Sequence, residues 1–378
     1  MRLALALALL SPLAGATTYV VDVANGPGTD FTQIATAIAA ASPGDTLLVR
    51  SGQYQSFVLD KSPTIANLDQ LGPGGTMLSA NQGAVMIDDL ETTSGVSVSS
   101  CTDVRFRRLA ALAGMQCGAS RVEIADSLVS GGTGSGTCSC CNYPSSPPPA
   151  GPGLVVLGGE VHLARTSVIG GHGAPLNCID PGICDGDGGA GGPGLQLQSG
   201  ARVVISGTSN HFVQGGAGGS SVCASGNQGP SGAALLAPAG CELRISGASL
   251  IGTVDNGGTL ITPVPADPTL FALDAPQAGT LWTLRAQAPA GSTVDVVLGR
   301  RPTLAPTPPL DGEPMCPVHR LFHLGVVPEN GTISLNFPVP PTWPQGFSVV
   351  FQSVVTLPDA SVRFTNSVPA VMRSSTGP

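Results

Sequence analysis

Polar and apolar residues alternate in the same way in five short segments of the chain. In each segment a charged residue is followed by an apolar residue, a variable residue and a second apolar residue. The segments are Asp103-Val-Arg-Phe106, Arg121-Val-Glu-Ile124, Glu160-Val-His-Leu163, Arg202-Val-Val-Ile205 and Glu242-Leu-Arg-Ile245. A two-residue period is that of a β-strand with one buried face. The pattern therefore predicts five strands whose apolar residues point the same way.

The spacing of these segments indicates a solenoid. The first two lie 18 residues apart, and the later ones are separated further by inserts that open at Gly131-Gly132, Gly170-Gly171 and Gly215-Gly216. Repeats of this length with small inward side chains predict an all-β fold whose body is a right-handed parallel β-helix. A β-sandwich or a propeller is the alternative, but a propeller blade needs about forty residues.

The charged residues that lead the five segments alternate in sign along the chain. In-register parallel strands would bring these positions to about 4.8 Å from one another, where opposite charges attract and like charges repel. A second column, Arg108, Asp126 and Arg165, follows the same rule. The alternation therefore supports stacking of the coils in register.

Residues 18–54 read TYVVDVANGPGTDFTQIATAIAAASPGDTLLVRSGQY. A strand, the sequence Asp30-Phe31-Thr32-Gln33, a short amphipathic helix over residues 34–41 and a second strand follow one another. This order resembles the N-terminal cap and first coil of pectin esterases and other pectin-lyase-like proteins. The resemblance implies a parallel β-helix whose apolar end is covered by the helix.

The resemblance implies less about activity. The esterase branch of the family uses two Asp residues and an Arg, but Asp88-Asp89 lacks the flanking residues of that motif. Gly171-His172-Gly173 matches the Gly-His-Gly of the polygalacturonase branch, yet the other catalytic residues of that branch are missing at fitting positions. No intact catalytic set of the family is therefore predicted, and shared fold alone does not establish function.

Composition divides the rest of the chain. Gly (52) and Pro (34) are abundant and charged residues make up only 11%, which disfavours helices and wide cores. We expect a signal peptide over residues 1–16, a β-helix over residues 17–261 and, after a Pro-rich linker, a small antiparallel β-sandwich over residues 262–378. The sandwich strands are predicted at residues 281–286, 293–298, 331–337, 347–357 and 361–364.

The N-terminus predicts export. Arg2, an apolar run over residues 3–10 and the sequence Ala14-Gly15-Ala16 form the parts of a signal peptide, with cleavage before Thr17. The protein is therefore expected to be secreted or held at the cell surface. No transmembrane segment is expected, and without a basic patch no nucleic-acid partner is expected.

Ten cysteines in an exported chain indicate disulfides, whose pairing the sequence leaves open. Cys101 and Cys117 could bridge neighbouring coils. A further group in the Gly/Pro-rich inserts is expected to connect those inserts: Cys138, Cys140, Cys141, Cys178, Cys184 and Cys223.

Two groups of residues are candidates for chemistry. Arg105, Glu123 and His162 would line up on an exposed face and could serve acid/base catalysis on an acidic glycan, although a solvated charge ladder is the favoured explanation. Asp185 and Asp187 lie in an Asp-x-Asp-Gly sequence that can hold calcium, although a turn rich in Asp and Gly explains it too. No other cofactor is expected.

Two functions remain open at this point. The first is a non-catalytic secreted β-helix protein with a surface, adhesion or glycan-binding role, whose partner is an extracellular polysaccharide or a cell-surface component. The second is a polysaccharide-active enzyme, namely a lyase, an esterase or a hydrolase, that acts on an acidic glycan.

Overall fold

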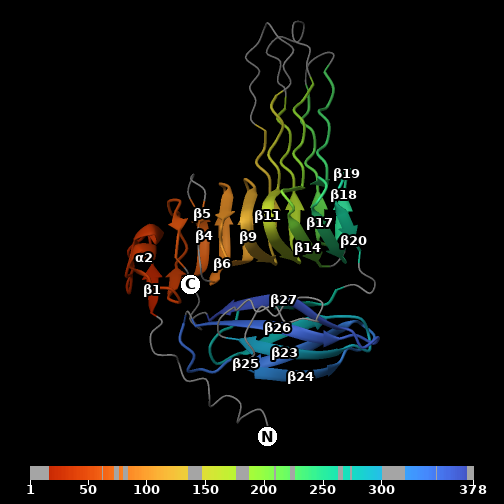
Figure 1. Ribbon diagram of the computed structural model, residues 1–378. Coiled ribbons are helices and arrows are strands. Elements are labelled where there is room, and N and C mark those ends of the chain that lie inside the picture. The colour runs from red at the N-terminus through yellow and green to blue at the C-terminus, as the bar shows by residue number, and fades with distance from the viewer. Residues whose placement is uncertain are drawn as a thin grey trace.

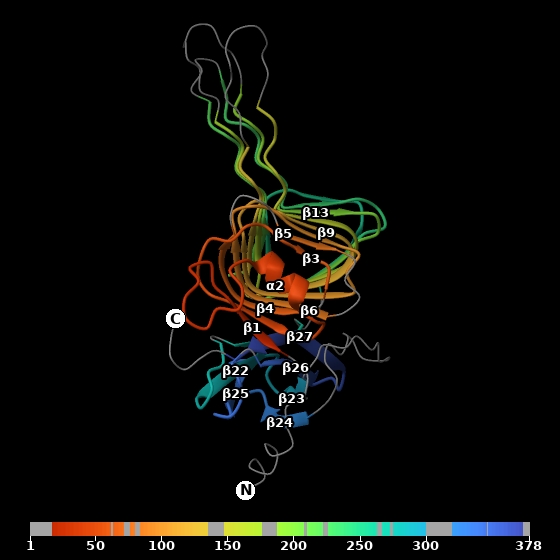
Figure 2. The ribbon, with the colours of Figure 1, turned by 90° about the vertical axis from the view of Figure 1, so that its left-hand side faces the viewer.

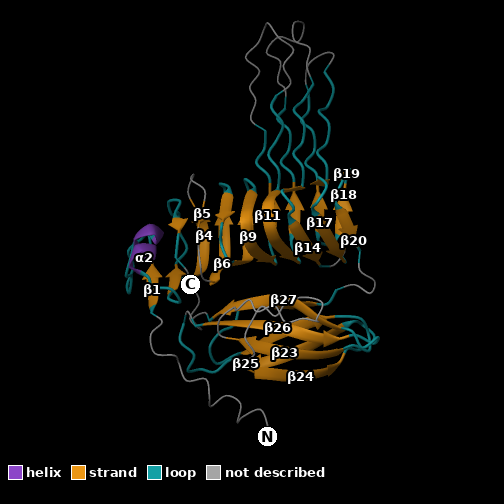
Figure 3. Cartoon of the chain, in the orientation of Figure 1, coloured by secondary structure: helices purple, strands orange, loops and turns teal. Residues whose placement is uncertain are grey.

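A computed structural model describes residues 17–61, 63–71, 76–79, 84–134, 147–175, 187–207, 210–221, 226–262, 267–272, 275–299, 320–345 and 347–372. Within these residues the one helix is α2 (Ile34–Ala40), and strands form the rest of the regular structure (Figure 3). One sheet contains 20 strands paired in parallel, and two antiparallel sheets contain 3 and 4 strands. The chain is therefore all-β, as the sequence predicts. The predicted signal peptide lies outside the described residues.

The large sheet, which we call the parallel body, consists of three ladders of stacked strands (Figure 1). The first ladder contains β1 (Thr18–Val21), β2 (Thr46–Val49), β4 (Thr64–Leu71), β6 (Ala84–Thr92), β8 (Asp103–Ala111), β9 (Met115–Ala125), β11 (Leu154–Ala164), β14 (Arg202–Ser206), β17 (Glu242–Ser246) and β20 (Thr259–Ile261). The second contains β3 (Val58–Leu59), β5 (Thr76–Ser79), β7 (Val96–Ser99), the first halves of β9 and β11, β13 (Leu195–Gln198), β16 (Leu235–Ala237) and β19 (Val254–Asn256). The third contains the end of β8, β10 (Leu128–Ser130), β12 (Ser167–Ile169), β15 (Phe212–Gln214) and β18 (Ser249–Ile251).

The five predicted strands stack in the register that their pattern requires. Val104, Val122, Val161, Val203 and Leu243 occupy equivalent positions of successive strands, and all are buried in one core. Helix α2 lies over the N-terminal end of the stack (Figure 2), where Ile34, Ala37 and Ile38 are buried. The apolar interior is therefore continuous from the helix to the last coils. In the described part of the chain, no helix is long and apolar enough to cross a membrane.

The C-terminal module consists of two antiparallel sheets that share one apolar core. One sheet has the order β21 (Thr269–Ala272), β22 (Leu281–Gln287), β25 (Thr332–Pro338), and the other has the order β24 (Arg320–Val326), β23 (Thr293–Gly299), β26 (Ser348–Thr356), β27 (Val362–Val371). Trp282 and Trp343 are both buried in the shared core. The module lies along one side of the parallel body, with β27 nearest to it (Figure 1).

Six extended segments project together from the opposite side of the body (Figures 1 and 2). We call them the glycine stalk; they comprise residues 131–134, 147–153, 170–175, 187–194, 215–221 and 226–234. Their backbones bond to one another, for example from Gly173 N to Ala217 O (2.8 Å) and from Gly192 N to Gly171 O (2.8 Å). The sequence indicates only insert loops here, whereas the described parts of these inserts form an ordered bundle.

The stalk repeats every three residues, which is the period of a polyproline II helix. In residues 170–175 and 215–220, two buried positions are followed by one exposed position, such as His172 or Ala217. Glycine occupies most of the buried positions because the backbones lie too close for side chains. A Cβ atom at Gly216 would overlap the carbonyl oxygen of Gly171. Gly132 stands at an edge of the bundle, where the nearest atom to an added Cβ would lie 3.9 Å away.

This difference predicts the effects of two alanine substitutions. We expect Gly216→Ala to destabilise the stalk by roughly 1–3 kcal/mol, because the neighbouring backbone has to move. Gly132→Ala, the matched control, should have little effect or stabilise slightly, because its Cβ has room. Hydrogen exchange of the stalk amides measures both effects, and equal protection in the two variants would contradict this close packing.

Candidate functional site

The three candidate catalytic residues lie side by side on the outer face of the first ladder. Arg105 is the register partner of Glu123, and Glu123 is the register partner of His162. The sequence predicts this alignment on an exposed face. In the structure, however, the C-terminal module covers Arg105 and Glu123, whose side chains are only 1% and 4% exposed. The expectation of an exposed face is therefore wrong at these two positions.

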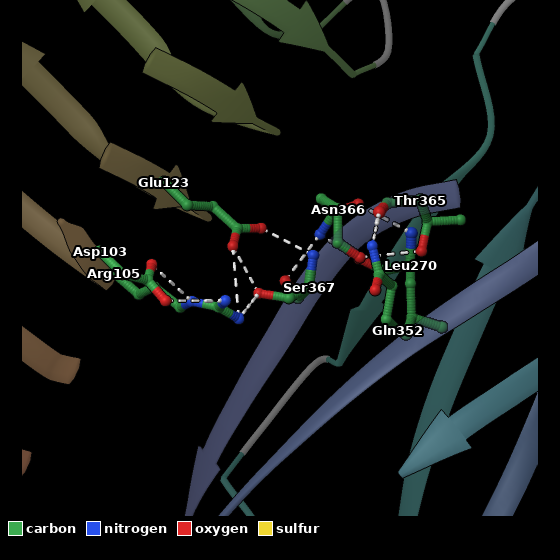
Figure 4. Close-up of polar contacts among 8 residues, drawn as sticks. All are labelled: Asp103, Arg105, Glu123, Leu270, Gln352, Thr365, Asn366 and Ser367. Carbon is green, nitrogen blue, oxygen red and sulfur yellow. Dashed lines mark hydrogen bonds and ion pairs between the residues drawn. The ribbon is translucent and has the colours of Figure 1, made fainter. Parts of the chain in front are cut away.

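Glu123 and Arg105 are held by Ser367 of strand β27 (Figure 4). The backbone N–H of Ser367 donates to Glu123 Oε1 (2.7 Å), and its hydroxyl donates to Glu123 Oε2. Arg105 Nη1 donates to the same hydroxyl oxygen (2.7 Å) and lies 3.9 Å from Glu123 Oε2. Asp103 accepts two further hydrogen bonds from Arg105, each of 3.2 Å. The two charges thus contact each other and β27, and neither faces solvent.

The neighbouring residues of β27 are fixed inside the module. Asn366 accepts a hydrogen bond from Leu270 N (2.9 Å) and donates one to Leu270 O (2.8 Å), which joins β27 to β21 (Figure 4). The hydroxyl of Thr365 accepts a hydrogen bond from Ser353 N (2.9 Å) in β26. Ser367 therefore contacts Glu123 from a strand whose position is set on both sides.

A second polar contact joins the two parts at Asp267, just before β21. Arg244 of the parallel body donates to both of its carboxylate oxygens (2.7 Å each), and Arg363 of β27 donates to one of them (2.7 Å). Such a bidentate arginine–carboxylate contact fixes the relative orientation of the two side chains as well as their distance. Asp267 therefore connects Arg244 of the parallel body with Arg363 of the C-terminal module.

Cation–π and apolar contacts complete the interface. The guanidinium of Arg165 lies 3.9 Å from the centre of the Phe271 ring. Arg165 also donates to Asp126 (2.7 Å), so the second predicted charge column is realised at this pair. Val371 of β27 packs with Leu48 and Met86, two apolar residues that point outward from the first ladder. Outward-pointing apolar residues at this face are explained by the module that covers them.

The protonation of Glu123 reflects its surroundings. Burial raises its pKa above the usual range, and the charge of Arg105 and the hydrogen bond from Ser367 offset this only in part. A raised pKa alone would suit a general acid. The Glu123 carboxylate nevertheless contacts Ser367 and Arg105 in this site. A substrate could reach it only if the module left this face.

His162, the register neighbour of Glu123, contacts the charge ladder at Glu160. Its Nε2 lies 2.9 Å from Glu160 Oε1, and Glu160 also contacts Arg202 (3.1 Å) and Arg121 (3.8 Å). Arg202 in turn contacts Glu242 (3.1 Å), so the predicted alternation continues to that coil. Burial opposes ionisation of Glu160, but the hydrogen bond from His162 and the neighbouring positive charges outweigh it and lower its pKa to about 2.

Of the two predicted calcium residues, the structure describes only Asp187. Asp187 accepts hydrogen bonds from the backbone N (2.8 Å) and Nδ2 (3.1 Å) of Asn227, while Asp185 lies outside the described residues. In the described ranges, no three His, Cys, Asp or Glu residues cluster as metal ligands would. The calcium prediction therefore stays untested at Asp185, and Asp187 has a structural partner within the stalk.

The predicted bridge between Cys101 and Cys117 does not form. Both are buried free thiols, as is Cys241. Cys117 is the register partner of Val98, whereas Cys101 N bonds to Ser120 Oγ (3.0 Å), so the two cysteines occupy different positions of their coils. Burial raises the pKa of Cys117, which keeps it a thiol of low reactivity. The six insert cysteines lie outside the described residues.

Comparisons with known proteins give no family for the chain. No family model, no curated protein and no solved structure matches it. The likeness of residues 18–54 to the pectin-lyase-like cap therefore remains a hypothesis that rests on the sequence alone.

A substitution at Glu123 tests whether the interface stabilises the fold. We expect Glu123→Ala to lower the free energy of unfolding by about 3 kcal/mol, because Arg105 loses a buried partner and Ser367 loses its acceptor. Glu242→Ala is the control, since it removes an exposed ion pair and should cost less than about 1 kcal/mol. Denaturant unfolding measures both, and equal losses would show that the interface is not a buried, coupled contact.

The low pKa of Glu160 predicts a specific dependence of stability on pH. Because the folded value of about 2 lies below the ordinary 4.5, the contribution of Glu160 is present above pH 4.5 and is lost as the pH falls towards 2. Glu160→Gln should therefore flatten the decline of the unfolding free energy over this range. Denaturant titrations at several pH values test this, and parallel curves for both proteins would contradict it.

Proposed function

We propose that this chain is a secreted, non-catalytic protein whose parallel body is a right-handed β-helix of the pectin-lyase-like kind. In this proposal the body and the C-terminal module form a rigid base, and the glycine stalk projects from it towards an extracellular polysaccharide or a cell-surface component. The role is adhesion or glycan binding at the surface. The calcium predicted at Asp185 and Asp187 is not required for it.

The observation that carries the proposal is the covered face of the first ladder. Arg105 and Glu123 are the residues best suited by type and alignment to acid/base work, and β27 buries both. A catalytic group must come within hydrogen-bond reach of the substrate. The burial of these residues therefore favours a structural role for them over a catalytic one.

The form of the stalk gives further support. The ionisable side chains of the described stalk segments are those of His172 and Asp187. Hydrogen bonds between the backbones of these segments make the projection stiff. Glycine at the buried positions serves close packing and leaves no side chains there for chemistry. A stiff projection with few ionisable groups is suited to contact a partner at a distance from the parallel body.

The second candidate function, an enzyme acting on an acidic glycan, keeps one supporting observation. Arg105, Glu123 and His162 are register neighbours on one outer face of the first ladder, an arrangement that could serve acid/base work if the module moved away. This alternative requires an open form in which β27 has left the first ladder.

Incubation of the purified protein with a panel of acidic and neutral polysaccharides, with and without calcium, separates the two functions. We expect the chain lengths to remain unchanged in size-exclusion chromatography and at least one intact polysaccharide to co-elute with the protein. Assays for released ester groups extend the test to de-esterification.

Shortened or de-esterified chains would overturn the non-catalytic proposal. The activity should then depend on Glu123, so that Glu123→Gln abolishes it while Glu242→Gln, an exposed control in the same sheet, retains it. If no polysaccharide binds or changes, the glycan-binding role fails and an adhesive role towards protein partners remains to be tested with whole cells.

A further inference from the structure

The C-terminal end of the parallel body leaves its core uncovered. Leu243 is 1% exposed, but Leu260, its register partner in the last coil, is 44% exposed. In the second ladder Leu235 is 0% exposed, and its partner Val254 is 43% exposed. The inward columns of the core therefore run to the end of the stack and stop at apolar side chains that face solvent.

Among the described residues, the backbone of the last coil has no strand partner on its outer side. Strands β18, β19 and β20 each pair with the preceding coil, and the described residues supply no strand on their other side. Free strand edges and exposed core together form a surface that favours association. The N-terminal end differs, because α2 closes it with Ile34 and Ile38 buried at 1% and 3%.

We propose that this end binds the same end of a second copy of the chain, so that two parallel bodies meet end to end in a two-fold dimer. The binding partner must present several unpaired strand edges arranged around one coil, with apolar side chains in the space that they enclose. The last coil of a second copy has this shape and chemistry. Because α2 closes the opposite end, the contact is isologous and stops at two chains.

The charge of the last coil agrees with self-association. Asp255 is the one charged residue between Gly247 and Thr262. Asp255 is the register partner of Leu236, on the outer side of the second ladder, whereas Val254 beside it continues the core column. Two such ends therefore meet through neutral groups, and little like-charge repulsion opposes the contact.

The dimer goes beyond the proposed function and does not depend on it. Two bodies joined end to end would carry two glycine stalks. A protein with two stalks can bind a repetitive surface with higher avidity than one stalk allows, provided that both reach it.

Light scattering during size-exclusion chromatography, over a roughly hundredfold range of loading concentration, tests the dimer. Non-reducing gel electrophoresis of the same samples identifies any dimer that is held by intermolecular disulfides. We expect the mass of two chains at the highest loading and dissociation on dilution. The variant Leu260→Asp should have the mass of one chain at every loading, because the contact would bury its charge.

Leu281→Asp is the matched control, since Leu281 is 69% exposed and belongs to β22 of the C-terminal module, outside the last coil. It should retain the mass of two chains. Circular dichroism confirms that each variant is folded, and Val254→Asp replaces Leu260→Asp if the latter is not. A single-chain mass for the unchanged protein at every loading, or a folded Leu260→Asp variant that remains dimeric, would overturn the proposal.

Discussion

The strands of the parallel body must lie in register from one coil to the next, because a shift of one residue would turn every inward side chain outward. This register places Val104, Val122 and Val161 in one core column. It also brings Glu160 between Arg121 and Arg202, where opposite charges meet. The stalk follows from the same constraint, because its outgoing segments leave from successive strands of the third ladder and therefore begin side by side.

The position of the C-terminal module decides how the outer face of the first ladder should be interpreted. Burying Arg105 and Glu123 costs solvation, which their mutual contact and their bonds to Ser367 and Asp103 offset. Such charges give the contact a defined geometry, since a shifted module would leave them unpaired. The same pair that suggests catalysis from the sequence thus orients the C-terminal module on the parallel body.

The sequence predicts the features that depend on local pattern and spacing. The all-β class, the in-register strands and the helix predicted over residues 34–41, which the structure places at Ile34–Ala40, follow from alternation, charge order and amphipathicity. The module's cover over Glu123 does not follow, because an outward charged residue looks the same in solvent and in an interface. Leu48 and Met86 carry the available signal, since outward apolar residues on nearby coils suggest a covered face. Ser367 and Asp267 carry no such signal, and the three-residue glycine period is visible in the sequence but is easily taken for loops.

Strand β27 covers the candidate site through direct contact between Ser367 and Glu123. A double-mutant cycle with Glu123→Gln and Ser367→Ala, followed by denaturant unfolding, tests this contact most directly. We expect a coupling energy on the order of 1 kcal/mol or more, because Ser367→Ala removes the hydroxyl that donates to Glu123 and Glu123→Gln removes the charged acceptor of that bond. The bond from the backbone N–H of Ser367 is available in all four proteins and cancels in the cycle. Losses that simply add, to within about 0.5 kcal/mol, would contradict this contact and leave the outer face of the first ladder open to substrate.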